Sequence, residues 1–96
     1  MIRHTVAFSL RHPPGSVEEV DFLTDARELG TIAGVQRFEQ LRQVSPLSSF
    51  AFSFSMEFDD QEAYAAYNDD PVHVEFVQRR WASEVEQFQE LDFVPL

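Results

Sequence analysis

The 96-residue sequence contains no cysteine and no lysine, and it has only three glycines. Without cysteine the chain cannot form disulfides, thiolate metal sites or a thiol nucleophile. Three scattered glycines also exclude a glycine-rich phosphate-binding loop. No apolar run approaches the ~18 residues that a membrane-spanning helix needs, and the N-terminus alternates in polarity, unlike a signal peptide. We therefore expect a cytoplasmic protein.

The charge balance is strongly acidic, with a formal net charge of -10 at pH 7. Such a surface repels nucleic-acid phosphates and anionic lipids, so we expect neither a nucleic acid nor a membrane as a partner. Hydrophobic residues make up 44% of the chain, which is typical of a globular protein, and ten residues are phenylalanine. The length fits a single domain over residues 1–96.

Two segments alternate between apolar and other residues with a period of two, which predicts strands with one buried face. The residues expected to face the core are Ile2, His4, Val6, Phe8 and Leu10 in the first segment and Phe50, Phe52, Phe54, Met56 and Phe58 in the second. Two more strands are predicted over residues 35–44, as a polar edge strand, and over residues 84–94. The apolar residues of the last strand are Val85, Phe88, Leu91 and Phe93.

Helices are predicted between these strands. Ser16 and the Glu three residues later match a capping box at the start of a helix over residues 17–29. Its apolar stripe would be Val20, Leu23, Ala26 and Leu29. A second helix would begin after residue 59 or 60, and a third at Asp70-Pro71, because Asp is a favoured N-cap and Pro suits the first helical turn. The third helix carries Val74, Val77 and Trp81.

The order strand, helix, strand, strand, helix, strand predicts an α+β, ferredoxin-like βαββαβ fold with a four-stranded antiparallel sheet. The helices would cover the phenylalanine-rich face. Small side chains on the other face would let a second sheet approach closely, which predicts a homodimer that forms a dimeric α/β barrel. The residues expected in that interface are Thr5, Ala7, Ser53 and Ser55. The alternative is a monomer whose sheet has one solvated face.

Four segments of the chain together form a recognisable pattern: residues 1–8 (MIRHTVAF), 32–35 (IAGV), 67–76 (YNDDPVHVEF) and 91–93 (LDF). These segments resemble the stress-responsive dimeric α+β barrel (Dabb) family. The third of these resembles the family's stretch of a Tyr followed by Pro-x-His-x-x-Phe. The resemblance extends over essentially the whole chain, and it implies the ferredoxin-like fold and the paired-sheet dimer.

The resemblance does not imply one activity. Members include a heat-stable stress protein and a polyketide cyclase that performs an aldol condensation without a cofactor. In that cyclase the positions of Tyr67 and His73 serve catalysis, and the position of His4 lines the pocket. The resemblance therefore implies Tyr67 and His73 as candidate catalytic residues.

Physical chemistry gives His73 two alternative roles. It would lie in the first turn of the third helix, where the helix dipole disfavours protonation of an imidazole. A neutral His73 could remove a proton next to a ligand carbonyl, while Tyr67 or His4 hydrogen-bonds the oxygen where charge develops. In the structural alternative, His73 donates to a backbone carbonyl and fixes the break between helices. His4 could likewise be a satisfied core residue, and His12 is expected on the surface.

An apolar ligand pocket is expected if the helices leave space above the sheet. Its predicted lining residues are His4, Phe52, Phe54, Val77 and Trp81. Tyr64 is expected to pack in the core. Two histidines without a nearby carboxylate make a poor metal site, so we expect no metal and no cofactor.

Three functions stay open at this point. The first is a homodimeric protein that binds a small aromatic or acyl ligand. The second is a cofactor-independent polyketide cyclase or isomerase that uses His73 and Tyr67. The third is a purely structural stress protein with a filled interior. The sequence leaves open whether the chain is an enzyme.

Overall fold

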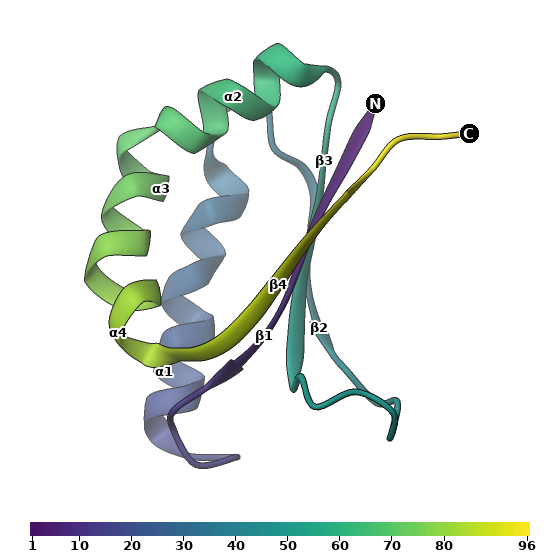
Figure 1. Ribbon diagram of the computed structural model, residues 1–96. Coiled ribbons are helices and arrows are strands. Elements are labelled where there is room, and N and C mark those ends of the chain that lie inside the picture. Colours follow the sequence, from purple (N-terminus) through teal and green to yellow (C-terminus); the bar gives the residue numbers. More distant parts are fainter.

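The computed structural model describes all residues, 1–96, and it has the predicted ferredoxin-like α+β architecture (Figure 1). The strands are β1 (Ile2–Leu10), β2 (Gln36–Arg42), β3 (Phe52–Phe58) and β4 (Val85–Phe93). They form one antiparallel sheet in the order β2-β3-β1-β4. The predicted edge strand, β2, is therefore an edge strand, and β4 forms the other edge.

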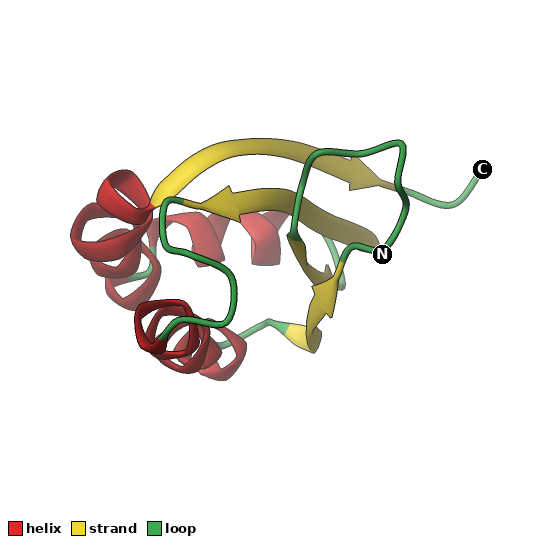
Figure 2. Cartoon of the chain, turned by 90° about the horizontal axis from the view of Figure 1, so that it is seen from below, coloured by secondary structure: helices red, strands yellow, loops and turns green.

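The helical segments gather on one side of the sheet (Figure 2). They are α1 (Val17–Asp25), the 3₁₀ segment η1 (Ala26–Thr31), α2 (Gln61–Asp69), α3 (Pro71–Phe76), the π-helical turn η2 (Val77–Trp81) and α4 (Ala82–Glu84). None of them is long and apolar enough to cross a membrane. The predicted caps are confirmed, because the side chains of Ser16, Asp60 and Asp70 each accept a hydrogen bond from a backbone amide of the following helix.

The alternation in β1 and β3 places their bulky residues under the helices, as predicted. Val6 pairs with Phe54 and His4 with Met56 across the two strands, and all four residues are buried. Residues that are direct partners in an antiparallel pair share a face. The pair of Ala7 with Ser53 therefore lies on the other face of the sheet, which no helix covers. Phe50 was expected in β3 but precedes the strand and is only half-buried.

The predicted stripe of the first helix was wrong in its first turns. Val20 is 58% exposed, whereas Phe22 is fully buried and joins Ala26 and Leu29 in the core. The bulky Phe22 ring sets which side of α1 faces the sheet, because it removes the largest apolar surface from water. Glu19 shares that side, and its carboxylate accepts from the amide of Gly15.

The last strand and the last helix also depart from the prediction. The register of β4 against β1 shifts between Ser9 and Leu10, and of the four apolar residues expected in β4 only Val85 is buried. Leu91, opposite Thr5, lies with Phe93 on the face without helices, and both are half exposed. In α3, Phe76 is buried and Val74 is exposed, so the apolar stripe starts from a different residue than predicted.

Candidate functional site

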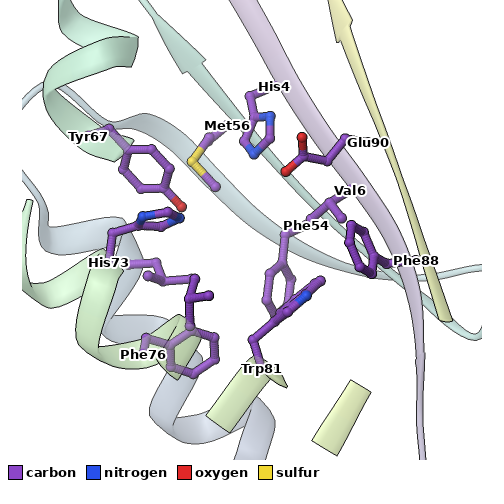
Figure 3. A pocket seen from close by; sticks show the side chains of 12 residues that line it. His4, Val6, Phe54, Met56, Tyr67, His73, Phe76, Trp81, Phe88 and Glu90 are labelled. Atoms are coloured by element: carbon purple, nitrogen blue, oxygen red, sulfur yellow. The ribbon is translucent and has the colours of Figure 1, made fainter. Parts of the chain in front are cut away.

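A cavity of about 250 Å³ lies between the sheet and the segment α2–α3–η2 (Figure 3). Nine of its twelve lining residues are hydrophobic. Of the five residues predicted to line it, four do: His4, Phe54, Val77 and Trp81. Phe52 instead lines a second hollow beside Arg42, whose guanidinium lies 5.3 Å from the ring centroid of Phe52.

The polar groups of the cavity gather around two histidines and a tyrosine. His4 comes from β1, Tyr67 from the end of α2, and His73 from α3 (Figure 3). The break at Asp70 places the last two close together, with their ring centroids 4.5 Å apart. Glu90 of β4 is a further lining residue. The sequence did not predict Glu90 or Phe88 as lining residues, because only the register of β4 turns both toward the cavity.

His4 is held by a carboxylate that lies 88 positions away in the sequence. Its Nδ1 is 2.6 Å from Asp92 Oδ1, and the Tyr64 hydroxyl donates to the other oxygen, Oδ2, at 2.8 Å. A carboxylate can only accept, so Nδ1 carries the ring proton and the lone pair of a neutral imidazole lies on Nε2. Burial, followed by the hydrogen bond to Asp92, raises the pKa of Tyr64, which keeps its hydroxyl protonated.

The expectation that no carboxylate lies near the histidines was therefore wrong. Tyr64 packs in the core, as predicted, and its hydroxyl in addition binds Asp92. Asp92 is the direct partner of His4 across the β1–β4 ladder, and this pairing exists only in the folded sheet. A period-two count along β4 from Phe88 does place Asp92 on the same face. No group of three or more His, Cys, Asp or Glu residues could hold a metal ion.

His73 is oriented by the backbone of the preceding helix. Its Nδ1 lies 3.1 Å from the carbonyl oxygen of Asn68, which can only accept, so Nδ1 donates and Nε2 keeps the lone pair. Burial lowers the pKa of His73, although this hydrogen bond opposes the effect. The ring is thus mainly neutral at pH 7, and a neutral imidazole can accept a proton.

Tyr67 combines deep burial with an unused hydroxyl. The residue is only 2% exposed, yet its hydroxyl forms no hydrogen bond with the protein, in contrast to that of Tyr64. The ring borders the cavity and the hydroxyl points toward His73 (Figure 3). Burial, and then the charge of Glu90, raise the pKa of Tyr67, so the group is a hydrogen-bond donor at neutral pH. Such a donor is a binding group for a ligand oxygen.

His12 does not line the cavity, and its expected surface position was only partly right. The ring is half-buried, and its Nε2 lies 2.7 Å from Glu84 Oε1. Glu84 also binds Arg80 through two hydrogen bonds, which lower the pKa of the Glu84 carboxyl. Glu84 thus connects the last helical turn, through Arg80, with the loop after β1, through His12.

Comparison with known proteins agrees with this architecture. Residues 2–95 match the family model described as the stress responsive A/B barrel domain, Dabb. The chain belongs to the Dabb family. A crystal structure of a Dabb protein with a ferredoxin-like fold from Mesorhizobium loti is 58% identical, with a TM-score of 0.98, over 99% of this chain and 96% of that one. No curated protein matched the sequence.

More distant structures share the fold of this Dabb chain. A dimeric protein of ferredoxin-like fold from Bacteroides fragilis is 22% identical, with a TM-score of 0.71, over 96% of this chain and 93% of that one. A hydroxynitrile lyase from Passiflora edulis is 17% identical, with a TM-score of 0.81, over 99% of this chain and 93% of that one.

Proposed function

We propose that this Dabb protein is a homodimer in which each subunit binds one small, mainly apolar compound in the cavity beside His73. The observation that carries the proposal is the Tyr67 hydroxyl, which has no hydrogen-bond partner in the protein and borders that cavity, although the residue as a whole is only 2% exposed. A hydroxyl that is open to a mainly apolar cavity and unpaired in the protein can bond to a ligand or to a bound water.

The size and lining of the cavity define the class of compound. An apolar cavity of about 150 Å³ can hold benzene, so about 250 Å³ leaves room for a ring with one or two substituents. Phe54 and Trp81 offer aromatic surfaces for such a ring, and their centroids lie 6.3 Å apart. At the polar end, Tyr67 would donate to a carbonyl or hydroxyl oxygen. A small aromatic or acyl ligand fits these features.

The single tryptophan of the chain provides the assay, because Trp81 lines the cavity. We expect 4-methylacetophenone to change Trp81 fluorescence saturably. Tyr67→Phe should weaken its binding by roughly fivefold or more, since a lost hydrogen bond is worth about 1 kcal/mol. Tyr64→Phe is the matched control, because its hydroxyl is bound to Asp92. An unchanged spectrum with every ring compound tested would instead support the structural role with a filled interior.

An enzymatic role is the second candidate, and the geometry of His73 favours it. A neutral imidazole whose Nδ1 proton is fixed by Asn68 presents Nε2 as a base. In the proposed step, Nε2 takes the proton from the carbon next to a ligand carbonyl, the C–H electron pair forms the enolate, and Tyr67 donates to the enolate oxygen. A cofactor-independent cyclase or isomerase would use this step, and the hydroxynitrile lyase from Passiflora edulis is an enzyme on the same fold.

Exchange of substrate protons tests this second candidate without knowledge of the natural substrate. In D₂O the protein should speed deuterium incorporation at the acetyl methyl group of 4-methylacetophenone, the one next to the carbonyl, as measured by NMR. His73→Ala should remove most of the acceleration. Full exchange activity in His73→Ala would rule His73 out as the base. Binding by Trp81 fluorescence in the same variant separates a lost base from a lost ligand.

The dimer is proposed through the sheet face that the helices leave bare. Thr5, Ala7, Ser53 and Ser55 give that face short side chains, and the half-exposed Leu91 and Phe93 add apolar surface that a partner sheet would cover. The structure from Bacteroides fragilis is described as dimeric. Sedimentation should therefore give a species of twice the 11.1 kDa chain mass.

A charge introduced on that face should dissociate the pair, because a buried unpaired charge is costly. Ser53→Glu tests the sheet face, and Thr24→Glu adds the same charge to the exposed side of α1 as a control. Dissociation by Ser53→Glu alone supports the proposed interface. A parent protein that sediments as a monomer at micromolar concentration would refute it.

A further inference from the structure

Glu90 is the one carboxylate among the residues that line the cavity. It pairs with Val6 across the β1–β4 ladder, and Val6 belongs to the buried face of the sheet. Glu90 therefore sits on the helix-covered side of an edge strand, and its carboxylate points toward the polar end of the cavity (Figure 3). Together with Phe88, which is 54% exposed, it marks the mouth of the cavity.

Two other carboxylates near the ends of β4 are paired within the protein. Asp92 binds His4 and Tyr64, and Glu84 binds Arg80. Glu90 forms no hydrogen bond or ion pair with the protein, and no arginine lines the cavity. A carboxylate that faces an apolar cavity without a counterion has unused capacity to accept hydrogen bonds.

The charge of Glu90 reaches the other polar groups of the cavity. It raises the pKa of Tyr67, and it opposes the lowering of the His73 pKa that burial causes. Both effects mean that negative charge is disfavoured, and positive charge favoured, at this end of the cavity. A second anion placed there would meet repulsion from Glu90, and no arginine or lysine lines the cavity to offset it.

We propose that Glu90 determines the ligand class: the cavity accepts ring compounds whose polar end is neutral or cationic, binds most tightly those that donate a hydrogen bond to Glu90, and excludes carboxylates. This inference rests on the proposed binding function. A phenol, alcohol or amine can donate to the Glu90 carboxylate, and hydrogen bonds to an ionised acceptor are roughly twice as strong as neutral ones. The oxygen of a phenol or alcohol can also accept from Tyr67, so one group satisfies both unpaired residues. An ionised acid can satisfy only Tyr67.

Three compounds on one scaffold test the inference by Trp81 fluorescence titration at neutral pH and fixed salt. They are 4-methylbenzyl alcohol, 4-methylbenzylamine and 4-methylbenzoate, which differ mainly in the charge of the polar end. We expect the benzoate to bind roughly tenfold or more weakly than the alcohol, the size expected for like charges a few ångströms apart in a partly solvated site. The amine should bind at least as tightly as the alcohol.

The same titrations in Glu90→Gln identify the residue responsible. The difference in binding affinity between the alcohol and the benzoate should shrink to about threefold or less, because the glutamine amide keeps the shape of the side chain and removes its charge. Glu86→Gln is the matched control, since Glu86 is an exposed carboxylate of the same strand that does not line the cavity. It should leave this difference unchanged. Glu90 is exposed, and urea unfolding of Glu90→Gln should confirm that the variant remains folded.

The outcomes separate this inference from the function on which it rests. Binding of all three compounds with equal affinity, or a difference that persists in Glu90→Gln, overturns the role of Glu90 and leaves ligand binding intact. If none of the three compounds changes the fluorescence, and 4-methylacetophenone also has no effect, the binding function itself is refuted and the ligand class with it.

Discussion

Replacing Asp92 by Asn should destabilise the fold, because Asp92 holds two buried side chains at once. The Asp92 carboxylate accepts from His4 Nδ1 at 2.6 Å and from the Tyr64 hydroxyl at 2.8 Å. Asn has the same shape but only one oxygen, so it can accept one of these bonds, as a neutral acceptor. The other position becomes an amide donor that faces a donor.

The expected loss follows from these two bonds. A hydrogen bond to a charged group contributes about 1.5–3 kcal/mol and a neutral one about 0.5–1.5 kcal/mol. The Asp92 side chain is 38% exposed, so water can replace part of what is lost and the lower ends of these ranges apply. We expect a decrease in the free energy of unfolding of about 1–2 kcal/mol. With a urea slope of roughly 1–1.5 kcal/mol per molar for a chain of this size, the midpoint should fall by about 1 M.

Urea unfolding followed by far-UV circular dichroism measures this shift. All variants must be compared at one protein concentration, since dimerisation makes the midpoint concentration-dependent. Glu86→Gln makes the same carboxylate-to-amide change at an exposed position of the same strand and should cost less than about 0.5 kcal/mol. If Asp92→Asn lowers the midpoint no more than Glu86→Gln does, the reasoning is wrong.

A double-mutant cycle tests the link between Asp92 and Tyr64 directly. Tyr64→Phe removes the hydroxyl while keeping the ring that stacks on Phe58 at a centroid distance of 5.0 Å. The losses from Tyr64→Phe and Asp92→Asn should not add, with a coupling of more than about 0.5 kcal/mol. Strict additivity would mean that the two side chains do not cooperate.

Three further predictions concern the helical layer. The hydrogen bonds from Arg80 lower the pKa of Glu84 in the folded protein. The stability that they add is complete above the unfolded pKa of about 4.3, and it is lost as the pH falls through the folded pKa. Glu84→Gln should therefore make the melting temperature depend less on pH in this range. Gly30→Ala should lower the free energy of unfolding in urea by about 1–3 kcal/mol, since its Cβ would lie 3.0 Å from Phe38 Cβ. An unchanged free energy would mean that η1 and β2 can move apart. Asp70→Ala should cost about 1 kcal/mol through the lost cap on the Val72 amide, and Asp70→Ser should recover most of it; equal losses would exclude capping.

The sequence carried enough information for the fold and for one side of the cavity. The period-two patterns of β1 and β3 fixed which residues lie under the helices, because a strand cannot turn one side chain over without turning the others. The Asp70-Pro71 pair fixed the break that brings Tyr67 beside His73, since the residue before a proline avoids helical dihedrals. Both rules could be applied to the sequence because they depend only on residues that are neighbours in it.

The pairing of β1 with β4 was decided by tertiary structure alone. Whether the carboxylate of Asp92 meets His4, and whether Glu90 lies opposite Val6, depends on the pairing of residues more than eighty positions apart in the sequence. A period-two count along β4 gives the face on which Glu90 and Asp92 lie, but it does not give the residues of β1 that they meet. The sequence alone determined a sheet covered by helices, with His4 on the covered face of the sheet and His73 in the helix that starts at Asp70-Pro71. Only the long-range pairing of β1 with β4 decided that Asp92 and Glu90 lie near these histidines, because strand pairing depends on the packing energy of the whole sheet rather than on any local pattern.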